Sequence, residues 1–290
     1  MFEGFRNHWV EVGELGIHAR VGGDGPPLLL LHGYPQTHVM WHRLAPALAR
    51  EFTVVCPDLR GYGDSDKPAS DAFHTPYCKR AMANDQLGLM SALGFERFAV
   101  AGHDRGGRVA HRLALDHPDR VERLAVLDIV PTLEIFRTTD QRLATAYYHW
   151  FFLIQPDGLP ETLIGAMPEY YLREKLRRWS RVLDAFDPAA VAEYVRCFSR
   201  PETIHATCED YRAAAGIDLE HDGADLYRRV HAPLLVLWGA RGIMHQIYDV
   251  PATWRARAER VTSKALDCGH FLAEEAPEET LAALREFFLD

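Results

Sequence analysis

The sequence predicts an α/β fold in which a mostly parallel sheet is flanked by helices and an all-helical segment is inserted between two strands. Short, fully apolar runs are typical of strands buried on both faces of a parallel sheet. Helical patterns alternate with these runs, as they do in βαβ units. The alternation stops after the apolar run at residues 124–127 and resumes only at the run at residues 234–238. The apolar runs are residues 28–31, 53–56, 98–101, 124–127 and 234–238.

The other elements of the predicted sheet region follow the same logic. Residues 8–12 and 15–19 alternate apolar with polar side chains on either side of a Gly-Glu turn, which predicts an antiparallel hairpin. Helical periodicity predicts helices at residues 41–51, 78–93 and 107–117.

The inserted segment shows helical periodicity and no convincing strand. We therefore predict a core domain of residues 1–133 and 230–290 and a helical cap of residues 134–229. Because the insertion leaves from the carboxyl ends of strands, where open α/β sheets bind ligands, we expect it to cover the active edge. A helical domain packed elsewhere is the alternative. Prolines mark expected helix starts and linkers at positions 156, 160, 168, 188 and 201.

Composition narrows the class of ligand. The chain has 290 residues and a formal net charge of -9, which argues against nucleic acid or an anionic membrane as a partner. An acidic protein that binds an anion needs a local positive patch. No apolar run approaches the ~20 residues of a membrane span, and residues 1–12 lack a signal-peptide pattern. The five cysteines have no metal-binding spacing, so we expect reduced thiols, a cytoplasmic location and no metal or cofactor.

A tight turn with the sequence GHDRGG follows the third apolar run, at residues 102–107. It has the G-x-nucleophile-x-G form of the elbow between a strand and a helix in α/β-hydrolases, with Asp104 in place of the usual serine. A carboxylate suits displacement at a saturated carbon, which gives an ester of the enzyme. The helix N-terminus favours the ionised form of this carboxylate. The alternative is that Asp104 only caps the helix.

An ester on Asp104 needs a general base to activate water, normally a His oriented by a carboxylate. His270 lies in a loop after a late strand-like run, which is the expected position for this His. Asp128 follows the fourth apolar run, whereas Gly239 stands after the fifth, where many members of the fold carry Asp. We favour Asp128 as the orienting acid, although a plain strand-end turn also explains it. Asp249 is a weaker candidate because it comes a few residues too late.

The turn after the first apolar run consists of His32, Gly33, Tyr34 and Pro35. A Gly-rich turn at the carboxyl end of a strand can aim backbone N–H groups into the site. Together with the N–H of Arg105, these groups are expected to form the oxyanion hole for ester hydrolysis. A plain loop turn is the alternative.

Two arginines, Arg105 and Arg108, are three residues apart and can share one face of the helix start. Two guanidiniums can hold a substrate carboxylate in a bidentate clamp and offset its repulsion from Asp104. The pair therefore predicts a small anionic substrate. In the alternative, Arg105 pairs with Asp104 or Asp128, and Arg108 is a solvated helix residue.

Together with segments of the cap and of the His loop, these residues resemble the fluoroacetate (haloacetate) dehalogenases over essentially the whole chain. The segments are HDRGGR at 103–108, YYHW at 147–150, CEDYR at 208–212 and CGHF at 268–271. The resemblance implies an α/β-hydrolase fold with an eight-stranded sheet, and a homodimer. It also implies that Asp104 displaces the halide of a haloacetate and that Asp128 orients His270 to hydrolyse the ester to glycolate.

The resemblance assigns the halide to the cap. His149, Trp150 and Tyr211 are implied to donate hydrogen bonds to the departing halide, and such compact donors suit fluoride, a poor leaving group. Packing is the alternative for these aromatic residues in amphipathic helices. Tyr34 departs from the family, because Phe often stands there, and its hydroxyl puts the substrate preference in doubt.

Competing functions share part of this pattern. An epoxide hydrolase uses the same Asp nucleophile with cap tyrosines that protonate the epoxide, but it does not need the two arginines. A non-catalytic binding member of the fold does not need the nucleophile, acid and His together. A serine esterase is nearly excluded because no serine stands at the elbow. The tyrosines available to an epoxide hydrolase are Tyr147, Tyr148, Tyr170, Tyr171 and Tyr211.

Overall fold

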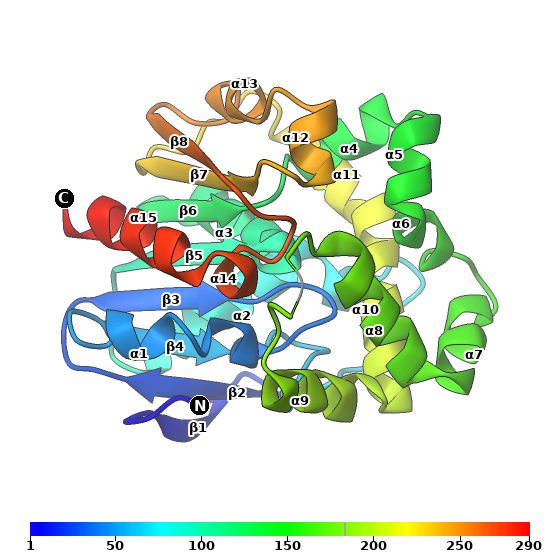
Figure 1. Ribbon diagram of the computed structural model, residues 1–290, viewed down its shortest axis with the longest axis horizontal. Coiled ribbons are helices and arrows are strands. Elements are labelled where there is room, and N and C mark those ends of the chain that lie inside the picture. Colours follow the sequence, from blue (N-terminus) through cyan, green and yellow to red (C-terminus); the bar gives the residue numbers. More distant parts are fainter. Residues whose placement is uncertain (183) are drawn as a thin grey trace.

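The computed structural model describes residues 1–182 and 184–290. Within these residues, eight strands form one sheet of order β1-β2-β4-β3-β5-β6-β7-β8 (Figure 1). The β1–β2 and β2–β4 pairs are antiparallel, and the other neighbours are parallel, so the predicted mostly parallel sheet is confirmed. The strands are β1 (Arg6–Val12), β2 (Leu15–Gly22), β3 (Pro27–Leu31), β4 (Thr53–Pro57), β5 (Phe98–His103), β6 (Val121–Leu127), β7 (Leu234–Gly239) and β8 (Val261–Leu266).

The burial of each strand follows its sequence pattern. β4, β5 and β7 are buried at every position, as expected for apolar strands covered by helices on both faces. β1 alternates exposed with half-buried residues, because this edge strand packs only one face against the protein. The central strands therefore hold the carboxyl-terminal loops in fixed positions.

Helices of the sheet region cover its faces. The expected helix at 41–51 is instead a 3-10 helix, η1 (His38–Trp41), followed by the short α1 (Ala45–Leu48). Pro46 explains the break, since proline is tolerated in the first turn of a helix but not in its interior. The other elements of this region are η2 (Thr75–Tyr77), α2 (Lys79–Ala92), α3 (Asp104–Asp116), α12 (Ile243–Ile247), α13 (Val250–Arg255), α14 (Leu272–Glu275) and α15 (Pro277–Leu289).

Helices follow one another between β6 and β7, and they gather on one side of the sheet (Figure 1). Proline occupies the first turn of four of them, at positions 160, 168, 188 and 201, where its missing N–H costs no hydrogen bond. The division of the chain into a core and a cap domain stays a prediction. The helices are α4 (Thr132–Thr138), α5 (Gln141–Ala146), α6 (Tyr148–Phe152), α7 (Leu159–Ala166), α8 (Pro168–Trp179), α9 (Pro188–Phe198), α10 (Pro201–Ala215) and α11 (Ile217–Ala224).

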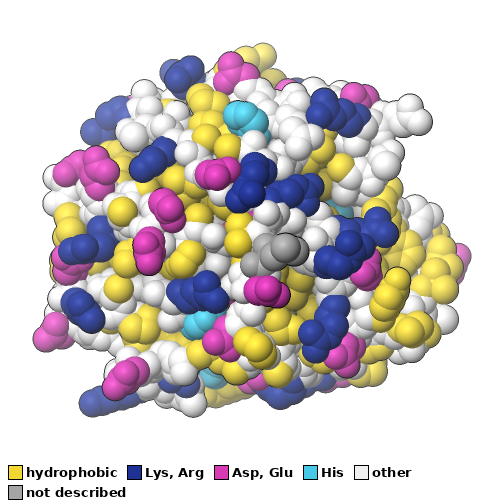
Figure 2. All heavy atoms as spheres, in the orientation of Figure 1, with side chains coloured by type: hydrophobic (Ala, Val, Ile, Leu, Met, Phe, Trp, Pro, Cys, Tyr) yellow, Lys and Arg dark blue, Asp and Glu magenta, His cyan; other side chains and the backbone are white. Residues whose placement is uncertain are grey.

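The composition-based expectations concern thiols and membranes. All five cysteines are buried and free. In the part of the chain that the structure describes, no helix is both long and apolar enough to cross a bilayer. On the face shown in Figure 2, Lys and Arg side chains are interspersed with Asp and Glu, and several dark blue groups lie on the half that holds the helices between β6 and β7.

Candidate active site

Asp104 lies at the tip of a tight turn between β5 and α3. Its φ of 46° is in the left-handed region, which is uncommon for a residue other than glycine. A Cβ on Gly102 would lie 2.4 Å from the carbonyl oxygen of Gly106, and a Cβ on Gly106 would lie 2.3 Å from that of His32. The two glycines are therefore required by the close approach of the backbone, as the elbow pattern predicts.

The carboxylate of Asp104 is buried but favourably surrounded. The backbone N–H of Tyr34 donates a hydrogen bond of 2.9 Å to its Oδ2. Burial raises the pKa of Asp104, but the nearby His270, His103 and Arg108 outweigh burial, so that the pKa is lower than usual. The residue is thus an anion at neutral pH, as a nucleophile must be.

The structure brings Asp128 and His270 together. The Nδ1 atom of His270 lies 2.6 Å from Oδ2 of Asp128, and the N–H of Gly239 donates to Oδ1 over 3.0 Å. Burial alone lowers the pKa of His270, but the hydrogen bond and the charge of Asp128 raise it above its ordinary value. This is the arrangement of an oriented general base.

Positions 239 and 249, which the sequence analysis also considered for the acid that orients His270, have other roles in the structure. A Cβ on Gly239 would lie 1.9 Å from the carbonyl oxygen of Gly269, so the backbone leaves no room for a carboxylate side chain there. Asp249 accepts the N–H of Ala252 over 3.0 Å and caps α13. Of the carboxylates considered from the sequence, Asp128 is the one in contact with His270.

The loop that carries His270 is held by Glu275, a residue that sequence reasoning missed. Its carboxylate accepts the N–H of Gly269 over 2.9 Å and that of Phe271 over 2.8 Å, one on each side of His270. It also accepts the N–H of Arg181 over 2.7 Å. In the sequence, Glu275 closely follows the loop that carries His270. It stands next to Glu274, a second glutamate that does not make these contacts.

The turn after β3 supplies one contact to the carboxylate of Asp104. The side chain of His32 faces Leu59, whose N–H donates to its Nε2 over 3.0 Å, so this imidazole orders the turn. A Cβ on Gly33 would lie 2.6 Å from Cβ of Asp104, which explains the glycine. The N–H of Tyr34 reaches Asp104. The use of this turn as an oxyanion hole stays a prediction.

Arg105 is fully buried and paired with Asp210 on α10, a partner that the sequence did not indicate. Its Nε and Nη2 donate to the two carboxylate oxygens of Asp210 over 2.9 and 2.6 Å. Lys79 and Tyr62 also donate to this carboxylate. Neither Asp104 nor Asp128, the partners named in the alternative reading, is bonded to Arg105. Its Nη1 has no hydrogen-bond partner among the described residues.

Arg108 is anchored on the other side, after β6. Its Nη1 donates to the carbonyl oxygen of Val130 over 2.9 Å and to Oγ1 of Thr132 over 3.0 Å. Burial and the charge of Arg105 lower its pKa. Arg108 is not a solvated helix residue, and its Nε also lacks a partner within the described ranges.

His149, Trp150 and Tyr211 pack together above the two arginines. The ring of Tyr211 lies 5.5 Å from that of His149 and 5.7 Å from that of Trp150, between ring centroids. The guanidinium of Arg105 lies 4.2 Å from the ring of Tyr211, and that of Arg108 lies 4.6 Å from Trp150. The three aromatic side chains are buried. Through these contacts, the predicted arginines and aromatic residues form one cluster.

Five polar atoms of this cluster have no partner in the part of the chain that the structure describes. They are Nη1 of Arg105, Nε of Arg108, Nδ1 of His149, Nε1 of Trp150 and Oη of Tyr211. Because buried polar atoms are normally hydrogen-bonded, such a concentration indicates a ligand site. The positive charge of the arginines indicates that the ligand is an anion.

A cavity of about 240 Å³ lies beside Asp128 and His270. It is lined by Asp128, Tyr147, Trp179 and His270, among other residues. The ring of Trp179 packs 4.5 Å from His149 and 5.5 Å from His270, between centroids. Trp179 therefore stands between the His270 loop and the aromatic cluster, a position that sequence reasoning did not anticipate.

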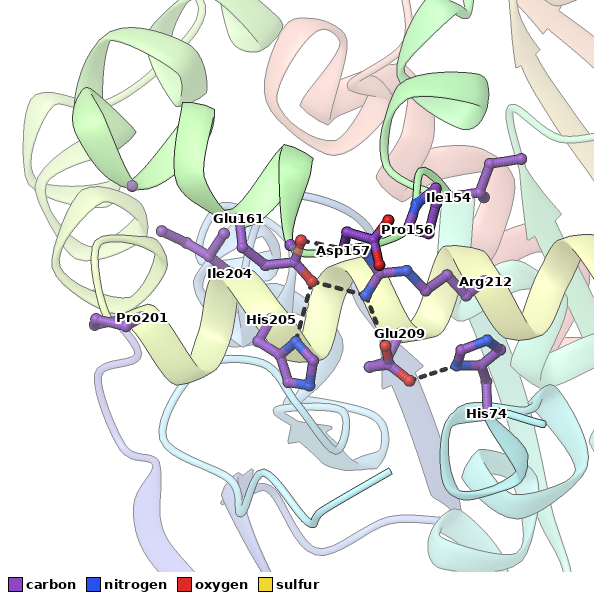
Figure 3. A pocket seen from close by; sticks show the side chains of 12 residues that line it. His74, Ile154, Pro156, Asp157, Glu161, Pro201, Ile204, His205, Glu209 and Arg212 are labelled. Atoms are coloured by element: carbon purple, nitrogen blue, oxygen red, sulfur yellow. Dashed lines mark hydrogen bonds and ion pairs between the residues drawn. The ribbon is translucent and has the colours of Figure 1, made fainter. Parts of the chain in front are cut away.

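A larger cavity of about 590 Å³ lies between α7, α10 and the segment around His74 (Figure 3). Its carboxylates, Glu161 and Glu209, both accept from Nη1 of Arg212 over 2.7 Å. His205 and His74 pair with the same two carboxylates (Figure 3). These charges satisfy one another, and the cavity contains none of the predicted site residues.

The fold and the site together define a class. Residues 26–277 match the family model described as alpha/beta hydrolase fold, and the chain belongs to this family. A fluoroacetate dehalogenase from Burkholderia sp is 50% identical, over 100% of this chain and 96% of the relative. The resemblance to fluoroacetate dehalogenases that the sequence motifs indicated is thereby confirmed.

Two further comparisons extend over nearly the whole chain. A soluble epoxide hydrolase from Corynebacterium sp. (strain C12) is 36% identical, over 99% of this chain and 95% of the relative. The crystal structure of ALR0039 from Nostoc sp PCC 7120 superposes with a TM-score of 0.99 at 63% identity, over 99% of each chain. The whole chain, including the helices between β6 and β7, is thus shared with these proteins.

Proposed function

We propose that this hydrolase cleaves the carbon–halogen bond of a small 2-haloacid, such as fluoroacetate or chloroacetate, to give glycolate and halide. The observation that carries the proposal is the cluster of unpartnered, buried donors beside the anionic Asp104. Arg105 and Arg108 suit the substrate carboxylate, and the aromatic donors suit the leaving halide. The similarity to the Burkholderia fluoroacetate dehalogenase supports the same reaction.

In the first step, a carboxylate oxygen of Asp104 attacks C2 of the haloacetate. A carbon–oxygen bond forms as the carbon–halogen bond breaks, and the bonding electrons leave with the halide. The two guanidiniums neutralise the substrate carboxylate, which otherwise repels the nucleophile. His149, Trp150 and Tyr211 donate to the charge that develops on the halogen, an interaction stronger in the transition state than in the ground state.

In the second step, His270 takes a proton from water while the water oxygen attacks the ester carbonyl of Asp104. Asp128 holds the imidazole and stabilises its protonated form. The N–H of Tyr34 is placed to donate to the oxygen that becomes negative. As this intermediate collapses, the bond to the glycolate oxygen breaks, that oxygen takes the proton from His270, and loss of the second proton of the water restores the Asp104 carboxylate. The net reaction consumes one water and yields glycolate, halide and a proton.

Epoxide hydrolysis is the second candidate, because the Corynebacterium relative bears that name and the buried hydroxyl of Tyr211 is a suitable acid for an epoxide oxygen. Against it stand Arg105 and Arg108, whose buried charges disfavour a neutral, apolar substrate. The same nucleophile and base serve both reactions, so the arginines decide between them.

The test compares fluoride and chloride release from fluoroacetate and chloroacetate with diol formation from styrene oxide. We expect halide release and no diol. Arg108→Met should lower kcat/KM for chloroacetate about 100-fold or more, because one half of the carboxylate clamp is lost. Arg173→Met is the matched control, since Arg173 is exposed on α8 and pairs with Glu169. Full-rate glycolate formation by Arg108→Met contradicts the proposal.

A further inference from the structure

Lys175, on α8, is a buried lysine that the reaction described above does not use. Its relative exposure is 1%, and its Nζ has no hydrogen-bond partner among the described residues. Burying an unpaired ammonium is costly, so a lysine here demands an explanation that packing alone does not provide.

Three aromatic rings surround the Lys175 ammonium. Its Nζ lies 3.7 Å from the centroid of Tyr148, 4.7 Å from that of Tyr171 and 5.6 Å from that of Trp179. The faces of aromatic rings attract cations and replace part of the lost hydration. These three rings form an aromatic cage that holds the Lys175 ammonium without supplying a counter-charge. The positive charge of the ammonium therefore acts on groups on the far side of the rings.

The group beyond the rings is His149. The ring of His149 lies 4.5 Å from Trp179 and 6.5 Å from Tyr148, both members of the cage. Burial lowers the pKa of His149, and the charge of Lys175 lowers it further. A neutral imidazole keeps one N–H to donate and one nitrogen without a proton.

We propose that Lys175 is a positioning residue for the halide: from behind the aromatic cage, its ammonium stabilises the anion that forms at the cluster of His149, Trp150 and Tyr211. This inference rests on the proposed function, because it concerns the halide side of the same site. Lys175 acts through His149 and across the rings, and it does not touch the reacting atoms.

The protonation of Lys175 is linked to anion binding. Burial and the charge of Arg178 lower the pKa of Lys175 to about 7, whereas Glu174 opposes them. The other groups facing it are Tyr148 and His149 on α6, with Tyr171 on α8. An anion at the cluster raises this pKa, so above pH 7 anion binding is accompanied by proton uptake.

The experiment measures chloride affinity by quenching of tryptophan fluorescence at pH 6 and pH 8.5, for the wild type, Lys175→Met and Lys175→Arg. His270 titrates in every variant, so the test compares between variants the ratio of chloride affinity at pH 6 to that at pH 8.5. We expect this ratio to be about tenfold larger in the wild type than in Lys175→Met or Lys175→Arg, with Lys175→Met the weaker and Lys175→Arg the tighter chloride binder of the two variants. Arg173→Met, on the exposed side of α8, should behave like the wild type.

A second readout is the ratio of kcat for fluoroacetate to kcat for bromoacetate. It should fall about tenfold in Lys175→Met, because fluoride needs the most stabilisation as it leaves, and Lys175→Arg should restore it. If the wild type releases no halide from haloacetates but its chloride affinity depends on Lys175 as expected, the proposed function fails and the role of Lys175 stands. Chloride affinity unchanged in Lys175→Met overturns that role, whatever the turnover.

If Lys175→Met does not fold, calorimetry of chloride binding to the wild type still decides. Measurement at pH 8 in two buffers of different ionisation enthalpy gives the number of protons taken up. Uptake of a fraction of a proton that persists in His270→Asn supports the inference, and uptake that disappears in that variant overturns it, because His270 at the same site can also take up a proton. Binding without proton uptake, or no chloride binding at all, overturns it.

Discussion

The strand-end side of the site and its helical side are built differently. On the strand-end side, formed by Asp104, Asp128 and His270, each carboxylate is already held by partners from the chain, such as the N–H groups of Tyr34 and Gly239. On the helical side, formed by His149, Trp150 and Tyr211, the rings are tightly packed but their polar atoms have no partners among the described residues. The first side is therefore internally hydrogen-bonded, as the proposed covalent chemistry requires, and the second offers donors to the proposed ligand.

The two arginines join these sides. Arg105 is fixed to Asp210 on a helix of the insertion, and Arg108 is fixed to Val130 and Thr132 directly after β6. The two guanidiniums are thus held by different segments, α10 and the stretch from Val130 to the start of α4, although both come from α3. Under the proposed function, a substrate carboxylate held between them fixes the position of C2 relative to Asp104, which an in-line displacement requires.

The largest effect is expected from Asp104→Asn on the strand-end side. An amide is a far weaker nucleophile than a carboxylate, so halide release should fall about 10⁴-fold or more. Halide electrodes measure the rate. Asp249→Asn, which alters the capping side chain of α13, should leave the rate nearly unchanged. Equal losses in the two variants point to a general loss of folding instead of a lost nucleophile.

His270→Asn separates the two half-reactions. The displacement does not need this imidazole, but hydrolysis does, so multiple turnover should fall about 10³-fold while one equivalent of halide is still released. Mass spectrometry of a protease digest should then locate the carboxymethyl ester on the peptide that contains Asp104. An unmodified Asp104 peptide after a full burst of halide is incompatible with the ester mechanism.

How far the sequence predicts this site depends on the side. Gly102, Gly106 and Asp104 predict the elbow because the backbone geometry is local, and the order of nucleophile, acid and His then points to Asp128 and His270. The arginine pair was found from its spacing at the helix start, whereas the aromatic donors were found by resemblance. No local pattern relates Arg105 to Asp210, which pairs with it through the packing of two distant helices. This pairing depends on tertiary structure alone.

Sequence patterns also gave a wrong helix where hydrophobic periodicity and a proline conflict. Hydrophobic periodicity predicts one helix over residues 41–51, but Pro46 limits it to a single short turn after a 3-10 helix. Similarly, Glu274 and Glu275 are adjacent and both buried, yet only Glu275 accepts the N–H groups around His270. Periodicity does not separate two neighbouring carboxylates whose roles are set by the loop in front of them.

Asp210→Asn tests the link between the two sides. The variant leaves the buried guanidinium of Arg105 without its counter-charge, which should lower the free energy of unfolding by about 3 kcal/mol. KM for chloroacetate should rise about tenfold, since the position of Arg105 is less defined. Urea denaturation and steady-state kinetics measure the two effects. Asp222→Asn, in the ion network of Arg112, is a control that should leave KM unchanged.

The smallest expected effect concerns pH and Glu275. Burial lowers the pKa of His270, but Asp128 raises it above its ordinary value, with smaller contributions from the charges of Asp104 and Glu275. Because the base must be neutral, hydrolysis of the ester slows as the pH falls through this pKa. Glu275→Gln should therefore move the acid limb of the rate profile to lower pH and keep the maximal rate within about threefold. The exposed Glu278→Gln is the control, and an acid limb that moves equally in both variants means that general surface charge, not the contact with the His270 loop, sets it.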